Sequence, residues 1–294
     1  MPALPIRRRT HLAQLGASLG TAWGAGLAAL AGSPARAQPE AGADAALAAA
    51  LAGPQRSANN RARDAARHPA ETLQFFGVRP AHSVLELSPG GGWYTEILAP
   101  WLRERGRLAV AHFARDDAQD YRRRGRANFE AKLAKHPELY DRVLVGTLPG
   151  GPLGPRFGEL PLAPGSVDCV LTFRNVHNWL EDSQLDDILR ASFALLRPGG
   201  VLGVVDHRAA PDTPLAQQIK TGYLTEALVA ERLRAAGFVA EARSEVNANP
   251  RDTRDHPHGV WSLPPTLRGG EATRERFLAI GESDRFTHRY RKPG

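Results

Sequence analysis

The chain has 294 residues, of which 38 are Lys or Arg and 31 are Asp or Glu, and its formal net charge is +7. Residues 1–37 hold four arginines and no acids, so the rest of the chain carries only +3, too small a surplus to favour a nucleic-acid partner. The single cysteine, Cys169, excludes an intramolecular disulfide, and its apolar neighbours are typical of a buried strand.

The first residues have the composition of an export signal. Arg7 to Arg9 precede a stretch without formal charge that ends in the cleavage pattern Ala35-Arg36-Ala37, and the arginine run resembles a twin-arginine signal. The stretch is too weakly apolar to predict a stable membrane span, although an uncleaved anchor is the alternative. We therefore expect a signal peptide at 1–37 and an exported, periplasmic protein. An alanine-rich lead at 38–55 and one domain at 56–294 would follow.

A glycine-rich turn follows the first predicted strand. Short helices over 57–68 and 69–76 precede this apolar strand at 84–88, glycines stand at 90, 91 and 92, and a helix is predicted over 93–104. Glycine lacks a β-carbon, so a ligand can approach its backbone closely, and the free N–H groups of the first helical turn favour an anionic group. The segment predicts a loop that binds a small molecule.

Spacing separates three kinds of loop with this plan. A phosphate-binding P-loop needs Lys and then Ser or Thr after the last glycine, where Trp93 and Tyr94 stand. A dinucleotide loop needs a sixth-position glycine, where Thr95 stands. A loop for S-adenosylmethionine has an acid followed by small residues at alternate positions, and the matching residues are Glu86, Ser88, Gly90 and Gly92. A glycine turn without a ligand remains the alternative.

Strands and helices then alternate along the chain. The predicted strands are 107–112, 141–146, 167–173, 201–206 and 238–246, and the helices are 117–135, 182–196 and 222–236. This alternation predicts an α/β fold with a doubly wound, mostly parallel sheet. Residues 284–292 alternate like an edge strand and have no helix long enough for a crossover before them. We therefore expect an antiparallel last strand in a seven-stranded sheet.

Three segments resemble the class I S-adenosylmethionine-dependent methyltransferases: VLELSPGGGWYTEIL, LPLAPGSVDCVLTFRNVHNW and LLRPGGVLGVVDHR. A closer resemblance is to a group of exported predicted methyltransferases in which PGGGWYTEILAP, GVWSLPP and GESDR recur. The resemblance implies a Rossmann-like methyltransferase fold that binds S-adenosyl-L-methionine. It places the amino acid end of the cofactor at Glu86, Ser88, Gly90, Gly91, Gly92 and Trp93, and the adenine near Glu159. His112 stands where the family has an acid for the ribose, with Asp116 and Asp117 following.

Polar residues follow the fourth and fifth predicted strands, where ligands of open parallel sheets bind. His177 is the candidate base for an acceptor proton, and Asn175 is a candidate contact of the cofactor or the acceptor. Asp206 is a candidate to orient the substrate or His207, the third candidate catalytic residue. The structural alternative is that these residues cap loops and a helix.

Residues 247–284 form a long polar insertion that we expect to cover the site. His256 and His258 lie within it, but without a third ligand at a defined spacing they predict no metal site. Together these features predict methyl transfer to an unidentified small or envelope-associated acceptor. The alternative is a non-catalytic periplasmic protein that binds or senses a ligand on the same fold. A nicotinamide-dependent oxidoreductase is disfavoured by Thr95.

Overall fold

The structure is a computed structural model that describes residues 41–150 and 153–294. The predicted signal peptide and its cleavage site lie outside these residues. None of the helices described is both long and apolar enough to cross a lipid bilayer.

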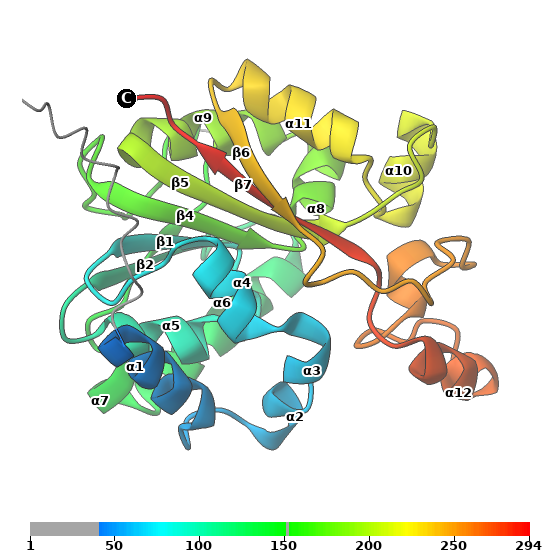
Figure 1. Cartoon of the computed structure of the whole chain (residues 1–294), viewed down its shortest axis with the longest axis horizontal. Coiled ribbons are helices and arrows are strands. Elements are labelled where there is room, and N and C mark those ends of the chain that lie inside the picture. The colour runs from blue at the N-terminus through cyan, green and yellow to red at the C-terminus, as the bar shows by residue number, and fades with distance from the viewer. Residues whose placement is uncertain (1–40, 151–152) are drawn as a thin grey trace, which may run out of the picture. The chain divides into compact units, whose positions relative to one another are not determined.

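One seven-stranded sheet organises the chain, with the strand order β3-β2-β1-β4-β5-β7-β6 (Figure 1). Strands β1 to β5 pair in parallel, and β7 is antiparallel to both β5 and β6. The strands are β1 (Ser83–Leu87), β2 (Arg107–His112), β3 (Leu144–Thr147), β4 (Val167–Phe173), β5 (Leu196–His207), β6 (Val239–Ser244) and β7 (Arg285–Arg291). This confirms the predicted doubly wound, mostly parallel sheet with an antiparallel last strand.

The prediction that the last strand lies at the edge is wrong. Strand β7 lies between β5 and β6, so β6 forms the edge. Thr287 and His288 of β7 are buried, whereas most of β6 is exposed. The buried His288 ring has a polar partner, since its Nε2 lies 2.9 Å from a carboxylate oxygen of Glu226. A sequence pattern cannot reveal such a partner, so the polar positions of β7 resembled those of a solvated strand.

Helices cover both faces of the sheet, with α1, α4, α5 and α6 on one side and α8, α9 and α11 on the other (Figure 1). The structure divides the predicted helix at 57–68 into two and adds short helices that the sequence did not predict. The helices are α1 (Ala41–Ala52), α2 (Ala58–Arg61), α3 (Asp64–Arg67), α4 (Pro69–Phe75), α5 (Thr95–Leu102), α6 (Asp120–Ala134), α7 (Pro137–Tyr140), α8 (Val176–Glu181), α9 (Leu185–Leu195), α10 (Leu215–Thr221), α11 (Glu226–Ala235), α12 (Glu271–Ile280) and the 3₁₀ helix η2 (Gly259–Ser262). The alanine-rich lead thus contains a helix, and its Leu47 is buried in the core.

Side chains of β1 alternate between two apolar cores. Val84 packs with residues of α4 and α5, whereas Leu85 and Leu87 pack with residues of α8 and α9 on the other face. Because successive side chains of a strand point to opposite faces, Glu86 lies on the side of α5. The alternation therefore places the carboxyl group of Glu86 near the beginning of α5.

The carboxyl ends of the parallel strands meet at one edge of the sheet. Ser88, Phe113, Arg174 and Arg208 are the first residues after β1, β2, β4 and β5. The insertion at 247–284 reaches the same edge, because Arg285 at the beginning of β7 pairs with the last residue of β5. In Figure 1 this segment, with α12, lies beyond the tip of β5.

Candidate functional site

The alternating small residues of the glycine loop adopt left-handed backbone conformations. Ser88, Gly90 and Gly92 have φ of 49°, 57° and 79°. This explains the alternating small residues of the motif, since a larger side chain costs about 1–2 kcal/mol in this region. Ser88 has a β-carbon and therefore carries this cost. Its Oγ accepts a hydrogen bond of 3.1 Å from Nε1 of Trp179. Strain of this kind is concentrated at ligand sites.

Side chains from two other segments hold carbonyl groups of this loop. The Asn175 amide donates to the carbonyls of Leu87 and Ser88 at 3.2 Å, and Nζ of Lys132 donates to the Gly91 carbonyl at 2.7 Å. The N–H groups of Gly90 and Gly91 have no hydrogen-bond partner among the residues that the structure describes. The protein's own side chains thus hold the loop in place before a ligand binds, and the loop retains free N–H donors for that ligand.

His112 contacts the loop through one ring nitrogen, and its other ring nitrogen is also occupied. Its Nδ1 accepts a hydrogen bond of 2.7 Å from the Phe113 N–H, and its Nε2 lies 3.2 Å from the Gly90 carbonyl. Burial lowers the pKa of His112 to about 4, so the ring is neutral with its proton on Nε2. Neither nitrogen remains for a ribose hydroxyl. Asp116, predicted beside it, is exposed and lines a cavity instead.

Glu86 is a buried carboxyl group beneath the loop. The Thr95 hydroxyl donates to it at 2.6 Å, and the side chain is 2% exposed. Burial raises the pKa of Glu86 to about 7, although Thr95 and Lys132 act in the opposite direction. The folded protein therefore holds this proton more tightly than the unfolded chain does.

Relative to the wild type, the Glu86→Gln variant is expected to gain stability as the pH rises. A carboxyl group whose pKa is raised on folding favours the folded state below pH 4.5, and that contribution is lost as the pH rises to about 7. The loss is on the order of 3 kcal/mol. Glutamine removes the titration and keeps an acceptor for Thr95. Urea unfolding at pH 5 and pH 8 measures the free energy of unfolding of both proteins. An equal change in this free energy for the variant and the wild type would contradict the prediction.

Three adjoining cavities form a groove along this edge of the sheet. The first, of about 200 Å³, is lined by the glycine loop, Trp93 and Asn175. The second, of about 250 Å³, shares Ser88 and Asn175 with the first, and it shares Phe113 with the third, of about 850 Å³. Glu159, predicted near the adenine, lines the third cavity. The groove therefore brings the predicted loop residues and Glu159 to one continuous surface.

Trp93 has a supporting position at one end of the groove. Guanidinium groups of Arg56 and Arg67 lie 4.9 and 4.7 Å from its ring, and its Nε1 donates to the Asn60 carbonyl at 3.0 Å. The Trp93 ring thus holds the Arg67 guanidinium in place and also forms part of the wall of the first cavity.

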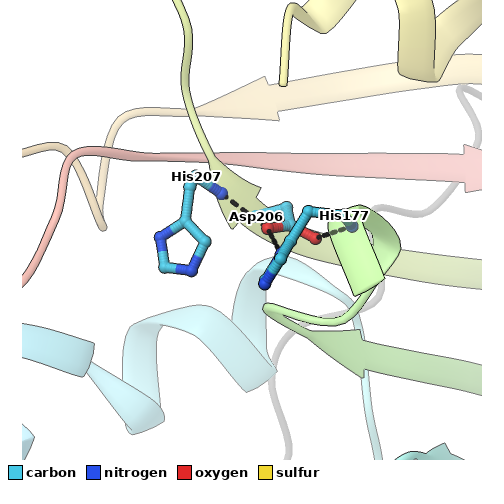
Figure 2. Close-up of side chains that lie close together, drawn as sticks. All are labelled: His177, Asp206 and His207. Carbon is cyan, nitrogen blue, oxygen red and sulfur yellow. Dashed lines mark hydrogen bonds and ion pairs between the residues drawn. The ribbon is translucent and has the colours of Figure 1, made fainter. Parts of the chain in front are cut away.

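The candidate catalytic residues form a buried cluster at the ends of β4 and β5 (Figure 2). Nδ1 of His177 lies 2.9 Å from Oδ1 of Asp206, and the Val176 N–H donates to Oδ2 at 2.7 Å. The carboxylate therefore anchors the first turn of α8 and orients the His177 ring. Nε2 of His177 has no hydrogen-bond partner among the described residues, so a ring that carries a single proton on Nδ1 leaves Nε2 free to accept one.

His207 joins this cluster to the insertion. Its ring lies 4.9 Å from the His177 ring, and its Nδ1 lies 2.5 Å from the Ser283 hydroxyl. Burial lowers the pKa of His207 well below its usual value, so the ring is neutral at pH 7. Trp261, also from the insertion, lies 6.1 Å from the His177 ring. The segment predicted to cover the site therefore contributes two contacts to it.

The same three side chains are close enough to hold a metal ion. Their ligand atoms lie within 4.8 Å of one another. However, both carboxylate oxygens of Asp206 accept N–H bonds, one of them from the ring of His177. The contacts describe an oriented His–Asp pair, in which His177 can accept a proton.

An arginine cluster at the first cavity was missed by the sequence reasoning. Arg63, Arg67 and Arg174 line this cavity and surround the carboxylate of Glu282. The available signals were the arginines at helical spacing within 57–68 and an arginine directly after the fourth strand. Neither signal indicated that distant segments meet here.

Comparisons with known proteins identify the fold. No family model and no curated protein matches this chain. Among solved structures, a SAM-dependent methyltransferase from Aquifex aeolicus is 16% identical, with a TM-score of 0.50 over 79% of this chain and 93% of that one. The [4+2]-cyclase SpnF is 18% identical, with a TM-score of 0.54 over 82% of this chain and 85% of that one.

The chain has the fold of S-adenosylmethionine-dependent methyltransferases. At these identities the likeness concerns the fold alone, and a structure described as a cyclase shares it. A reaction has therefore to be inferred from the loop, the groove and the His–Asp pair.

Proposed function

We propose that the protein is a class I S-adenosylmethionine-dependent methyltransferase that acts on a small or envelope-associated acceptor. The main support is the loop, in which Ser88, Gly90 and Gly92 take left-handed conformations beside free N–H groups. These donors suit the carboxylate of an amino acid. The groove leads from there to Asp116 and Glu159, where the ribose and adenine would lie.

The residues present account for the other requirements of a methyl transfer. S-adenosylmethionine supplies an electrophilic methyl group on a sulfonium. The protein has to align the donor with the acceptor and, for an oxygen or nitrogen acceptor, receive a proton. Nε2 of His177 would receive this proton, Asp206 would stabilise the resulting charged ring, and Asn175 holds the loop in place.

Calorimetry with S-adenosylmethionine, S-adenosylhomocysteine and NAD tests this function. We expect both sulfur compounds to bind and NAD not to bind. The absence of heat from both sulfur compounds would falsify the proposal. Binding of both without methyl transfer to any acceptor would favour the non-catalytic alternative.

Asp116→Asn is expected to weaken binding of S-adenosylhomocysteine about tenfold, because a charged acceptor for ribose hydroxyls contributes about 1.5–3 kcal/mol. Asp116 is exposed at the third cavity. Asp212→Asn is the matched control, since this exposed acid does not line the groove. Equal dissociation constants for both variants and the wild type would show that the ribose lies elsewhere.

We also propose that the protein works after export, on the basis of the signal predicted at 1–37. Fractionation of cells that express the full chain tests this, with sequencing of the mature amino terminus. We expect a periplasmic protein that begins at Gln38. Retention of the uncleaved chain in the cytoplasm would contradict it.

A further inference from the structure

Four arginines surround one buried carboxylate at the first cavity. We call Arg63, Arg67, Arg174 and Arg285 the arginine cluster, with Glu282 at its centre. Nε of Arg63 donates to Glu282 at 2.7 Å, and Nη1 of Arg285 donates at 2.9 Å. Arg67 contributes a bond of 3.1 Å, and Arg174 lies 3.8 Å away. One negative charge therefore faces four positive charges.

Other acids near the cluster do not remove this surplus. Glu86 lines the same cavity, but burial favours its neutral form and raises its pKa to about 7. The carboxylate of Asp206 opposes the lowering of the Arg174 pKa by burial and accepts hydrogen bonds from His177 and a backbone N–H group, so it offsets at most one of the positive charges. Burial lowers the pKa of Arg67 to about 9, with further lowering from the nearby charge of Arg174, as expected where positive charge is in excess.

The cluster presents unused donors at the cavity. Nη2 of Arg67 is buried and has no hydrogen-bond partner among the described residues. The Arg63 and Arg174 side chains keep 24% and 26% exposure while lining the cavity. Arg174 also has a φ of 63°, which is costly for a residue with a β-carbon. Backbone strain at an arginine that lines a cavity is consistent with a binding role.

The proposed cofactor does not neutralise this charge. Its amino acid end carries one carboxylate and one ammonium group, and its sulfonium adds a positive charge. Binding of S-adenosylmethionine therefore leaves the surplus of the cluster in place or increases it. A second, anionic ligand beside the donor is what the charge balance requires.

We propose that the methyl acceptor is a small oxyanion, a carboxylate or a phosphate ester, whose charged group is bound by Arg63, Arg67 and Arg174. This inference rests on the proposed function. Guanidinium groups suit such ligands because their paired N–H groups match two oxygens at once. The nucleophilic atom of the acceptor would then lie between the donor and His177.

Calorimetry on the full chain tests this binding. Inorganic phosphate and succinate are titrated separately, with sodium chloride at matched ionic strength, in the presence and absence of S-adenosylhomocysteine. We expect at least one oxyanion to bind while S-adenosylhomocysteine is bound, and Arg63→Gln and Arg174→Gln each to weaken it at least about tenfold. An oxyanion that S-adenosylhomocysteine displaces would occupy the place of the cofactor carboxylate and would contradict the inference. Tighter binding of phosphate or of succinate shows whether the charged group of the acceptor is a phosphate or a carboxylate.

Arg208→Gln is the matched control. Its side chain is 18% exposed and pairs with Glu226 and Glu245 outside the cavity, so the variant should bind as the wild type does. Circular dichroism of each variant checks folding, and Arg63→Lys retains the charge if glutamine is not tolerated. The inference is overturned if neither oxyanion binds or if both cavity variants bind normally. Failure of S-adenosylhomocysteine alone to bind would instead reject the proposed function.

Discussion

Gly91→Val is expected to abolish cofactor binding, with a loss of about 100-fold or more, equivalent to about 3 kcal/mol. Gly91 lines the first cavity, and a β-carbon added there would meet no other atom within 4 Å. Its φ is not in the left-handed region, so the free protein tolerates a side chain. The branched side chain would occupy space that the ligand needs beside the loop. Calorimetry with S-adenosylhomocysteine measures the effect.

Neighbouring substitutions separate steric exclusion from loss of structure. Gly90→Ala places a side chain at a φ of 57° and should lower the free energy of unfolding by about 1 kcal/mol. Gly91→Ala should unfold like the wild type and bind the ligand more weakly. If Gly91→Val binds S-adenosylhomocysteine with the wild-type dissociation constant, the loop is not the cofactor site.

His177→Ala is expected to lower turnover about 100- to 10,000-fold, the usual contribution of a positioned base. The cofactor should still bind, because Asn175 and Lys132, not His177, hold the loop. Turnover is measured with an acceptor found among small carboxylates and phosphate esters, and binding by calorimetry. The outcome distinguishes proton transfer from cofactor positioning.

His177→Asn is the informative companion to this variant. Its amide can still donate to Asp206, so α8 should keep its anchor, but it offers no nitrogen where Nε2 stood. We expect it to be stable and inactive. His258→Ala, an exposed histidine of the insertion, should be fully active. Equal loss of cofactor binding in both His177 variants would show that this residue is structural.

The loop motif illustrates what a local pattern can predict. Small residues at 88, 90 and 92 mark positions where the chain turns with positive φ, and this requirement is set by neighbouring backbone atoms. Strand and helix alternation is similarly local, since it follows from which side chains face a core. Both predictions therefore needed no knowledge of distant segments.

Polar partners over long separations could not be predicted in this way. Arg63 and Glu282 are 219 residues apart in sequence, and nothing in either local pattern indicates that they meet. The same limit applies to the buried position of β7, where His288 pairs with Glu226 of α11. Hydrophobic periodicity shows which face is buried, but not which charges pair across the core.

The sequence by itself determined the fold class, the strand that leads into the glycine loop, and the edge of the sheet where His177 and Asp206 would lie. These follow from backbone geometry and from the periodic placement of apolar residues. Only the tertiary structure decided that Nε2 of His112 contacts the loop while Nδ1 is occupied by the Phe113 N–H, and that the insertion brings Glu282 into the arginine cluster. Those contacts depend on packing between distant elements, which fixes the charge that a ligand meets.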